Sequence, residues 1–188
     1  RGGGMTRQSR ATVWALVAGL VASAALTSGC GYALAGRGSF LPANIKVIGV
    51  PVFTNTTPVF NLETQVTEKV RTEFLSRGKY RIQPAATGVD AVLTGSVTAV
   101  SIVPVSFTAQ QLASRYAITL TARVELRDVA ADVVLWENPG LVYRQEFEAQ
   151  SGQAVLDPSD FFGQDASALD RITTDFARSI VSAILEAF

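Results

Sequence analysis

The sequence of 188 residues contains no histidine and only one cysteine. Without histidine there is no Ser-His-Asp or Cys-His nucleophile pair and no histidine-ligated metal site. A single cysteine excludes an internal disulfide, a four-thiolate zinc site and an iron–sulfur cluster. Acidic and basic residues number 16 each, so no excess of positive charge favours binding to nucleic acid. These absences remove several common kinds of enzyme and binding site.

The first thirty residues have the layout of an export signal. Arg7 and Arg10 precede an uncharged stretch at 11–26, which is followed by small residues and then by Cys30. A basic start, an apolar segment and small residues at the cleavage site are the three parts of a secretory signal peptide. The apolar segment is shorter than the about 20 residues that a membrane-spanning helix needs. We therefore predict that residues 1–29 are a signal peptide.

Cys30 stands where a signal peptidase would cut, as in a bacterial lipobox, although Thr27 occupies the place where leucine is usual. In a lipobox the cysteine sulfur receives a lipid and the cysteine becomes the first residue of the mature chain. We predict that Cys30 is lipidated, that residues 30–44 form a lipidated tether, and that this covalent lipid is the only added group. Two acyl chains give stable anchoring to a membrane. The alternatives are a buried cysteine in a soluble protein and an N-terminal helix that remains as an anchor.

The segment after the tether predicts a strand and then a helix. Residues Ile45 to Phe53 are β-branched and apolar, and Pro51 near their end favours an edge strand or a bulge. Asn61 can cap a helix whose apolar side chains recur every four residues, and Gly78 is placed to end it. A short extended piece follows at 80–82.

Three longer strands come next. In the strand around 116–126, apolar and polar residues alternate strictly, which is typical of an antiparallel strand with one buried face. The third strand runs over 133–147, and we predict a bulge or a bend at its Asn-Pro-Gly sequence, 138–140. In the first strand, the residues predicted to share one face are Leu93, Gly95, Val97 and Ala99.

The C-terminal part predicts a loop and a second helix. Residues 151–163 show little periodicity, and Ser167 with Asp170 resembles a capping box. The apolar stripe of the helix that follows consists of Leu169, Ile172, Phe176, Ile180 and Ile184.

We predict no metal site in this part of the chain. Its aspartates lack the EF-hand pattern and suit helix starts better than calcium. They are Asp157, Asp160, Asp165 and Asp170.

These elements predict an α+β fold. We expect a two-layer sandwich with a mixed four-stranded sheet, in the order β-α-β-β-β-α, and two helices on one face of the sheet. A hydrophobic share of 48% is sufficient for a core, and the length fits one domain, which we place at 45–188.

Several segments together resemble the LptE family, whose members are outer-membrane lipoproteins of lipopolysaccharide assembly. No single segment is specific, because similar strands and helices occur in other envelope lipoproteins. The resemblance depends on their combination and runs in register from the cysteine to about residue 147. The segments are Cys30–Leu34 (CGYAL), Gly36–Pro42 (GRGSFLP), Ile45–Phe53 with Asn55–Thr57, Thr72–Gly78 (TEFLSRG), Ala91–Gly95 (AVLTG) and Leu135–Asn138 (LWEN).

The resemblance implies a non-enzymatic role. LptE-like proteins sit inside the LptD β-barrel, assist its assembly, plug its lumen and contact lipopolysaccharide on its way to the cell surface. The expected partners are therefore the LptD barrel, lipopolysaccharide and the outer membrane, with no nucleic acid. The expected location is the outer membrane, on its periplasmic side or inside the barrel lumen.

Two other functions stay open on the residues alone. One is a lipoprotein activator of a peptidoglycan synthase, resembling LpoB, although the tether before the first strand is short for that role. The other is a periplasmic enzyme, for which no constellation of side chains stands out.

Arg115 and Arg123 are the candidate contact residues for lipopolysaccharide or the barrel. They lie in phase on one face of the predicted strand, and arginine binds phosphate in a bidentate manner. The alternative is that they pair with carboxylates across the sheet, each pair contributing about 0.2–1 kcal/mol. Those carboxylates are Glu125, Glu146 and Glu148.

Overall fold

The computed structural model describes residues 41–148 and 157–188. All described residues belong to one compact unit. The signal peptide 1–29, Cys30 and most of the tether 30–44 lie outside the described residues, so these predictions remain predictions. No helix in the described part is both long and apolar enough to cross a membrane.

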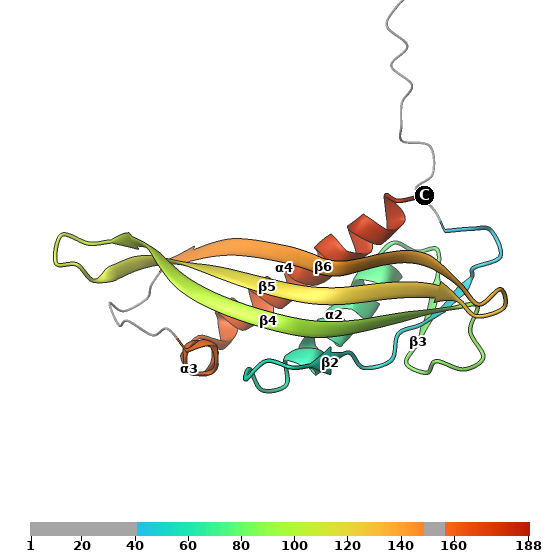
Figure 1. The fold of residues 1–188 in the computed structure, drawn as a ribbon, viewed down its shortest axis with the longest axis horizontal. Coiled ribbons are helices and arrows are strands. Elements are labelled where there is room, and N and C mark those ends of the chain that lie inside the picture. Colours follow the sequence, from blue (N-terminus) through green and yellow to red (C-terminus); the bar gives the residue numbers. More distant parts are fainter. Residues whose placement is uncertain (1–40, 149–156) are drawn as a thin grey trace, which may run out of the picture. The chain divides into compact units, whose positions relative to one another are not determined.

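The described chain contains six strands and three helices (Figure 1). Their bounds are β1 (Val47–Gly49), β2 (Thr54–Asn55), α2 (Leu62–Ser76), β3 (Arg81–Gln83), β4 (Ala91–Phe107), β5 (Ala113–Asp128), β6 (Val133–Glu148), α3 (Pro158–Gln164) and α4 (Ala166–Leu185).

All six strands belong to one mixed sheet. The order is β3-β1-β4-β5-β6, and β2 pairs with β4 beside β1. The strand β1 is parallel to β3 and β4, whereas β4, β5 and β6 are antiparallel. The prediction of an α+β fold with a mixed sheet is confirmed, but the count of four strands and two helices is wrong. The additional strands β2 and β3 have only two and three residues, and the additional helix α3 has seven. Segments this short show no hydrophobic periodicity in the sequence.

Of the predicted strand over 45–53, only Val47–Gly49 forms a strand, β1, and β2 begins just after the predicted segment, at Thr54. The strand β1 lies between β3 and β4, so the expectation of an edge strand is wrong. Pro51 follows β1 and precedes β2, where its missing N–H removes no bond of the sheet.

The strand β4 changes the phase of its faces at a bulge. Leu93 and Val97 are buried as predicted, but Ala99 is exposed and Ile102 is buried instead. The register with β5 shifts between Val97 and Ala99, and an extra residue in one strand moves every later side chain to the other face. The prediction that Ala99 shares a face with Leu93 is therefore wrong, because the register shift against β5 turns Ala99 to the opposite face.

The prediction for β5 is confirmed, because its even-numbered residues from Tyr116 to Leu126 are buried on the helix side. The predicted bulge in β6 is also confirmed. Ala122 pairs with Leu141 and Val124 with Asn138, so two residues of β6 face Arg123 alone.

The helix α2 has the predicted bounds but not the predicted cap. It begins after Asn61 and ends before Arg77, and Gly78 follows with a φ of 70°. Asn61 has a φ of 61° and its side chain caps no amide, so it supplies a left-handed turn into the helix.

The C-terminal helices are capped by aspartates. Part of the segment predicted as a loop forms α3, whose cap Asp157 accepts from the Ser159 amide at 2.8 Å. The predicted capping box of Ser167 and Asp170 is wrong, because Asp165 caps α4 and accepts from the Ala168 amide at 2.9 Å. The pKa of Asp165 is lowered, first by the Ser167 hydroxyl that donates to it and then by that amide.

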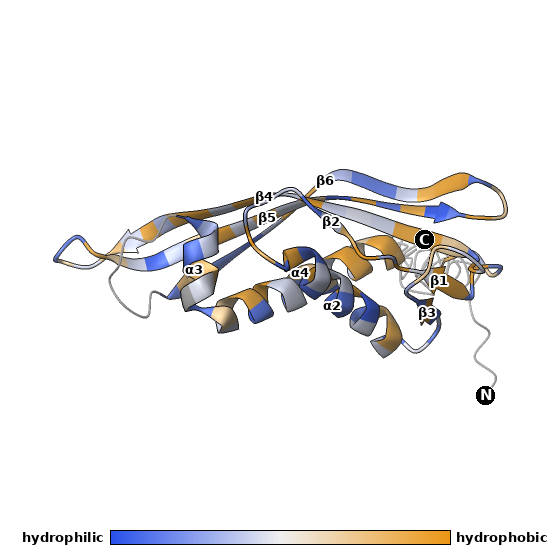
Figure 2. Cartoon of the chain, turned by 90° about the horizontal axis from the view of Figure 1, so that it is seen from below, coloured by the Kyte–Doolittle hydropathy of each residue, from blue (hydrophilic) through white to orange (hydrophobic). Residues whose placement is uncertain are grey.

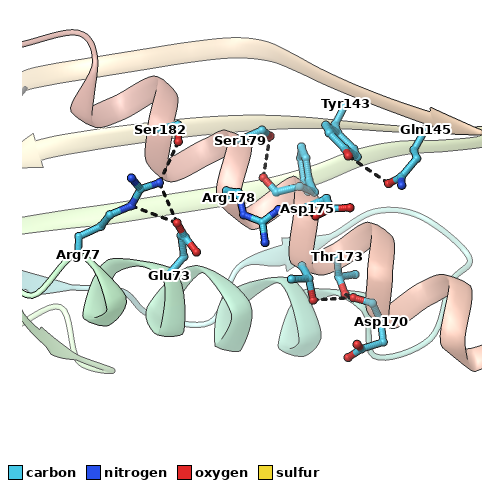
Figure 3. Close-up of polar contacts among 12 residues, drawn as sticks. Glu73, Arg77, Tyr143, Gln145, Asp170, Thr173, Asp175, Arg178, Ser179 and Ser182 are labelled. Carbon is cyan, nitrogen blue, oxygen red and sulfur yellow. Dashed lines mark hydrogen bonds and ion pairs between the residues drawn. The ribbon is translucent and has the colours of Figure 1, made fainter. Parts of the chain in front are cut away.

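The two long helices cover one face of the sheet (Figure 2). The whole apolar stripe predicted for α4, from Leu169 to Ile184, is buried in the core. Arg77 links the helices, since it bonds to Glu73 on α2 at 2.8 Å and to Ser182 on α4 at 3.0 Å (Figure 3). This layer fixes the sheet, and no described helix covers its other face.

Candidate interaction surface

The side of β4–β5–β6 opposite the helices, here called the outer face, is not covered by any described element (Figure 2). It is formed by the residues of the three strands that alternate with the buried ones. Most of its central side chains are short. They include Thr94, Ser96 and Ser101 on β4 and Thr119 and Thr121 on β5.

Arg115 lies at one end of the outer face and is ion-paired. Its guanidinium is 2.9 Å from Glu146 on β6, and both side chains are about half exposed, at 51% and 47%. The pairing across the sheet that was considered from the sequence is thus present for Arg115. A pair this exposed contributes at most about 1 kcal/mol and leaves the guanidinium accessible to a ligand.

Arg123 lies opposite the β6 bulge and is exposed. It borders a shallow pocket of about 300 Å³ that Glu125, Glu137 and Pro139 also line. Glu125 and Glu137 are directly opposite each other in the register. Arg123 has no ion pair with the residues that the structure describes.

The structure does not bring Arg115 and Arg123 into one site. They are eight residues apart on the same strand, which corresponds to roughly 27 Å along an antiparallel strand. One phosphate group cannot contact both. Each arginine would have to act in a separate contact along the face.

Arg127 is held by two carboxylates. It lies 3.0 Å from Glu125 and 2.9 Å from Asp132. The hydrogen bond with Glu125, followed by that with Asp132, raises the pKa of Arg127 above its ordinary value. The charges of this end of the outer face are therefore largely compensated within the sheet.

The far end of the β4–β5 hairpin is apolar and exposed. No residue from Ala91 to Ser114 is charged. Within this run, Val103 is 45% exposed, Phe107 60% and Leu112 48%. We call residues 103–112 the hairpin tip. Reasoning from alternation missed it, although the uncharged run was visible in the sequence.

Thr108 orders the turn of the hairpin tip. Its amide donates to the Leu112 carbonyl at 2.8 Å, and its hydroxyl accepts from the amides of Gln110 and Leu112 at 3.3 Å. Gln111 takes up a φ of 60°. The apolar side chains are therefore presented by a hydrogen-bonded turn.

A second exposed aromatic residue stands on the loop between β2 and α2. Phe60 is 91% exposed and borders an open depression of about 560 Å³. Asn55 fixes this loop, because its side chain donates to the Val59 carbonyl at 2.8 Å and accepts from the Thr57 amide at 2.9 Å. Buried Val59 anchors the loop beside Phe60.

Two carboxylates hold the opposite end of the sheet. Asp90 accepts from the amides of Lys46 and Val47 at 2.8 Å, and these bonds lower its pKa. Asp128 is buried and accepts from the Ala131 amide at 2.9 Å, which is the first cause of its lowered pKa. Both act on backbone groups, so we interpret them as structural.

No group of three or more potential metal ligands occurs in the described part of the chain. The predicted helix-start role is confirmed for Asp157 and Asp165. Asp170, on α4, lies 2.6 Å from Lys69 of α2.

The model of the LptE family, described as "Lipopolysaccharide-assembly", matches residues 45–184. No curated protein matches the chain.

Solved structures show similarity at the level of the fold. A hypothetical protein from Chlamydia trachomatis is 12% identical, with a TM-score of 0.50, over 75% of this chain and 96% of that one. PelC from Paraburkholderia phytofirmans, solved as a dodecamer, is 19% identical, with a TM-score of 0.47, over 80% and 94%. Rare lipoprotein B from Shewanella oneidensis is 12% identical, with a TM-score of 0.43, over 76% and 98%.

Proposed function

Because the chain belongs to the LptE family of lipopolysaccharide assembly, we propose that it is a non-enzymatic outer-membrane lipoprotein that partners and plugs the LptD β-barrel. In this role it assists assembly of the barrel and the transport and insertion of lipopolysaccharide at the cell surface. The lipid on Cys30 attaches it to the outer membrane.

The observation that carries this proposal is the bare outer face of the sheet. The lumen of a membrane β-barrel is polar, so a plug must offer a hydrophilic surface that still packs closely. A face of short hydroxyl side chains, such as Thr119, Thr121 and Ser101, satisfies both requirements. The helices meanwhile keep the apolar core on the other side.

The hairpin tip and the two arginines supply contacts of different chemistry. Lipopolysaccharide combines apolar acyl chains with phosphate groups. Val103, Val105 and Phe107 are exposed apolar side chains suited to acyl chains. Arg115 and Arg123 are exposed cations suited to phosphate or to acidic groups of the barrel.

The alternative role as an activator of a peptidoglycan synthase is not favoured by the family match. No feature of the described surface points to that partner rather than to the barrel.

The test is affinity purification of the tagged full-length chain from outer membranes. Recovery of a large β-barrel protein as the main partner supports the proposal, and depletion of the chain should remove lipopolysaccharide from the cell surface. Recovery of a penicillin-binding protein instead, with normal surface lipopolysaccharide after depletion, would contradict it.

A further inference from the structure

The short strand β3 ends the sheet on one side. Among the long strands, two edges are open in the described part, and they differ in length and chemistry. One is β6, the last strand in the order. The other is the distal part of β4, because β2 pairs with β4 only at Ser96 and Val97. The Thr56 amide still donates to the Val97 carbonyl at 3.0 Å, and the Thr56 hydroxyl reaches the Thr98 carbonyl at 3.4 Å. Beyond Thr98, β4 pairs with β5 alone among the described strands.

The β6 edge carries the features that block pairing with another strand. Charged side chains, proline and bulges are the usual protection of an edge strand. Pro139 lies in a bulge in the middle of β6. Charged and exposed residues flank the bulge, namely Glu137, Arg144, Glu146 and Glu148.

The β4 edge lacks charge altogether. No residue of β4 is charged, and its proline, Pro104, lies near a second register shift toward the hairpin tip. Residues 98–103, here called the open edge, therefore lie between Thr56 at one end and Pro104 at the other. Between its two register shifts, this edge carries neither a charge nor a proline, and such a stretch is a site for the addition of a strand.

The side chains beside the open edge define what would fit there. Ile102 is buried on the helix side and Val100 packs against the core, whereas Ser101 and Val103 are exposed on the outer face. A strand added at this edge would extend both faces of the sheet. Its side chains on the helix side would lie beside Val100 and Ile102 and should therefore be apolar. A charged side chain on that strand would find no opposite charge on β4, and burial of an unpaired charge is strongly unfavourable.

We infer that the open edge of β4 receives an extended, uncharged strand of a protein partner, which extends the sheet through main-chain hydrogen bonds. This inference rests on the proposed function, under which the strand belongs to the β-barrel partner. The chemistry of the edge selects the occupant, because a row of backbone N–H and C=O groups pairs best with another extended backbone. Because the open edge is only six residues long, it can pair with one short strand segment.

The experiment is photo-crosslinking in cells that produce the full-length chain. A photoreactive residue replaces Ala99 or Ser101 at the open edge, and Val142 on exposed β6 serves as the matched control position. We expect residues 99 and 101 to crosslink one uncharged strand segment of the barrel protein. Residue 142, which lies on the same outer face but not at the open edge, should capture that segment at least about ten-fold less efficiently.

Two lysine variants test the same inference without a photoreactive residue. Ser101→Lys adds a charge to the open edge, and Thr64→Lys adds the same charge to an exposed position of α2, away from the outer face. We expect Ser101→Lys to lower recovery of the barrel by about ten-fold and Thr64→Lys to leave it unchanged. Equal urea midpoints of the two purified variants would show that neither change acts through unfolding.

The outcomes separate the two proposals. If the wild-type chain does not recover a barrel, the proposed function fails. If it recovers the barrel but residues 99 and 101 crosslink nothing, or crosslink a second copy of this chain, the inference about the open edge is wrong and the proposed function stands.

Discussion

On β5, Ile118, Leu120 and Leu126 are fully buried on the helix side, whereas Arg115 and Arg123 on the opposite side are exposed. Both sets of residues come from the same strand and alternate with each other. The buried set is constrained by the volume that α2 and α4 leave, because protein interiors are close-packed. The outer set meets no other described element, so its short hydroxyl side chains are not explained by the fold. The difference indicates that one face holds the domain together and the other is available for contact.

The largest expected effect lies on the helix side. Phe176 of α4 is fully buried and its ring lies 6.1 Å from that of Tyr143. Phe176→Ala should lower the free energy of unfolding by about 3–5 kcal/mol, because it removes buried surface and leaves a cavity. Urea unfolding measures this change. A loss below about 1 kcal/mol would show that the helix layer is not the main source of stability.

A smaller loss is expected from Gly95→Ala at the core side of β4. A Cβ at Gly95 would lie 2.3 Å from the Phe53 ring, so the ring would have to move. We expect a loss of about 1–3 kcal/mol in urea unfolding. Gly140→Ala is the matched control, because a Cβ there meets nothing within 4 Å. Equal effects of the two substitutions would contradict the difference between the covered and open parts of the sheet.

Acid should weaken the end of the sheet where Asp90 and Asp128 bond to backbone amides. Their folded pKa values are lowered, so their contribution is present above the ordinary aspartate range and is lost as the pH falls through the lowered values. The urea midpoint should therefore drop on acidification below about pH 4. Asp128→Asn should show a shallower drop than the wild type. Parallel curves for the two proteins would contradict a stabilising role for the Asp128 carboxylate.

The smallest effect on stability is expected on the outer face. Arg115→Ala removes an exposed ion pair with Glu146 and should change the free energy of unfolding by less than about 1 kcal/mol. Arg123→Ala should change it no more, because Arg123 has no ion pair with the described residues. If either arginine binds phosphate, its variant should bind lipopolysaccharide less well. Unchanged affinity in both folded variants would leave the arginines without a role in lipid contact.

The same comparison explains which predictions from sequence were correct. The α4 stripe and the alternation of β5 are long and regular, so the periodic signal was strong for residues such as Phe176 and Leu120. The burial of Ile102 in place of Ala99 depends on a register shift against β5, which a pattern along one strand cannot contain. The strand β2 exists only because Asn55 and Thr54 meet β4, and such a two-residue contact leaves no pattern.

The candidate surface was predictable only in part. The placement of Arg115 and Arg123 on one polar face followed from alternation and agrees with the structure. The pairing of Arg115 with Glu146 was one of several pairings considered, because the register between β5 and β6 was unknown. The open edge of β4 could not be foreseen, since it depends on where β2 stops.

The central claim, that the outer face serves contact rather than stability, is tested most directly by Thr121→Arg. Thr121 lies on the outer face of β5 opposite Ala99 and Val142. Thr64→Arg, on an exposed position of α2, is the matched control. We predict an unchanged urea midpoint for both variants and about ten-fold lower recovery of the barrel protein for Thr121→Arg alone. Recovery of the barrel at the wild-type level by a folded Thr121→Arg variant would contradict the claim.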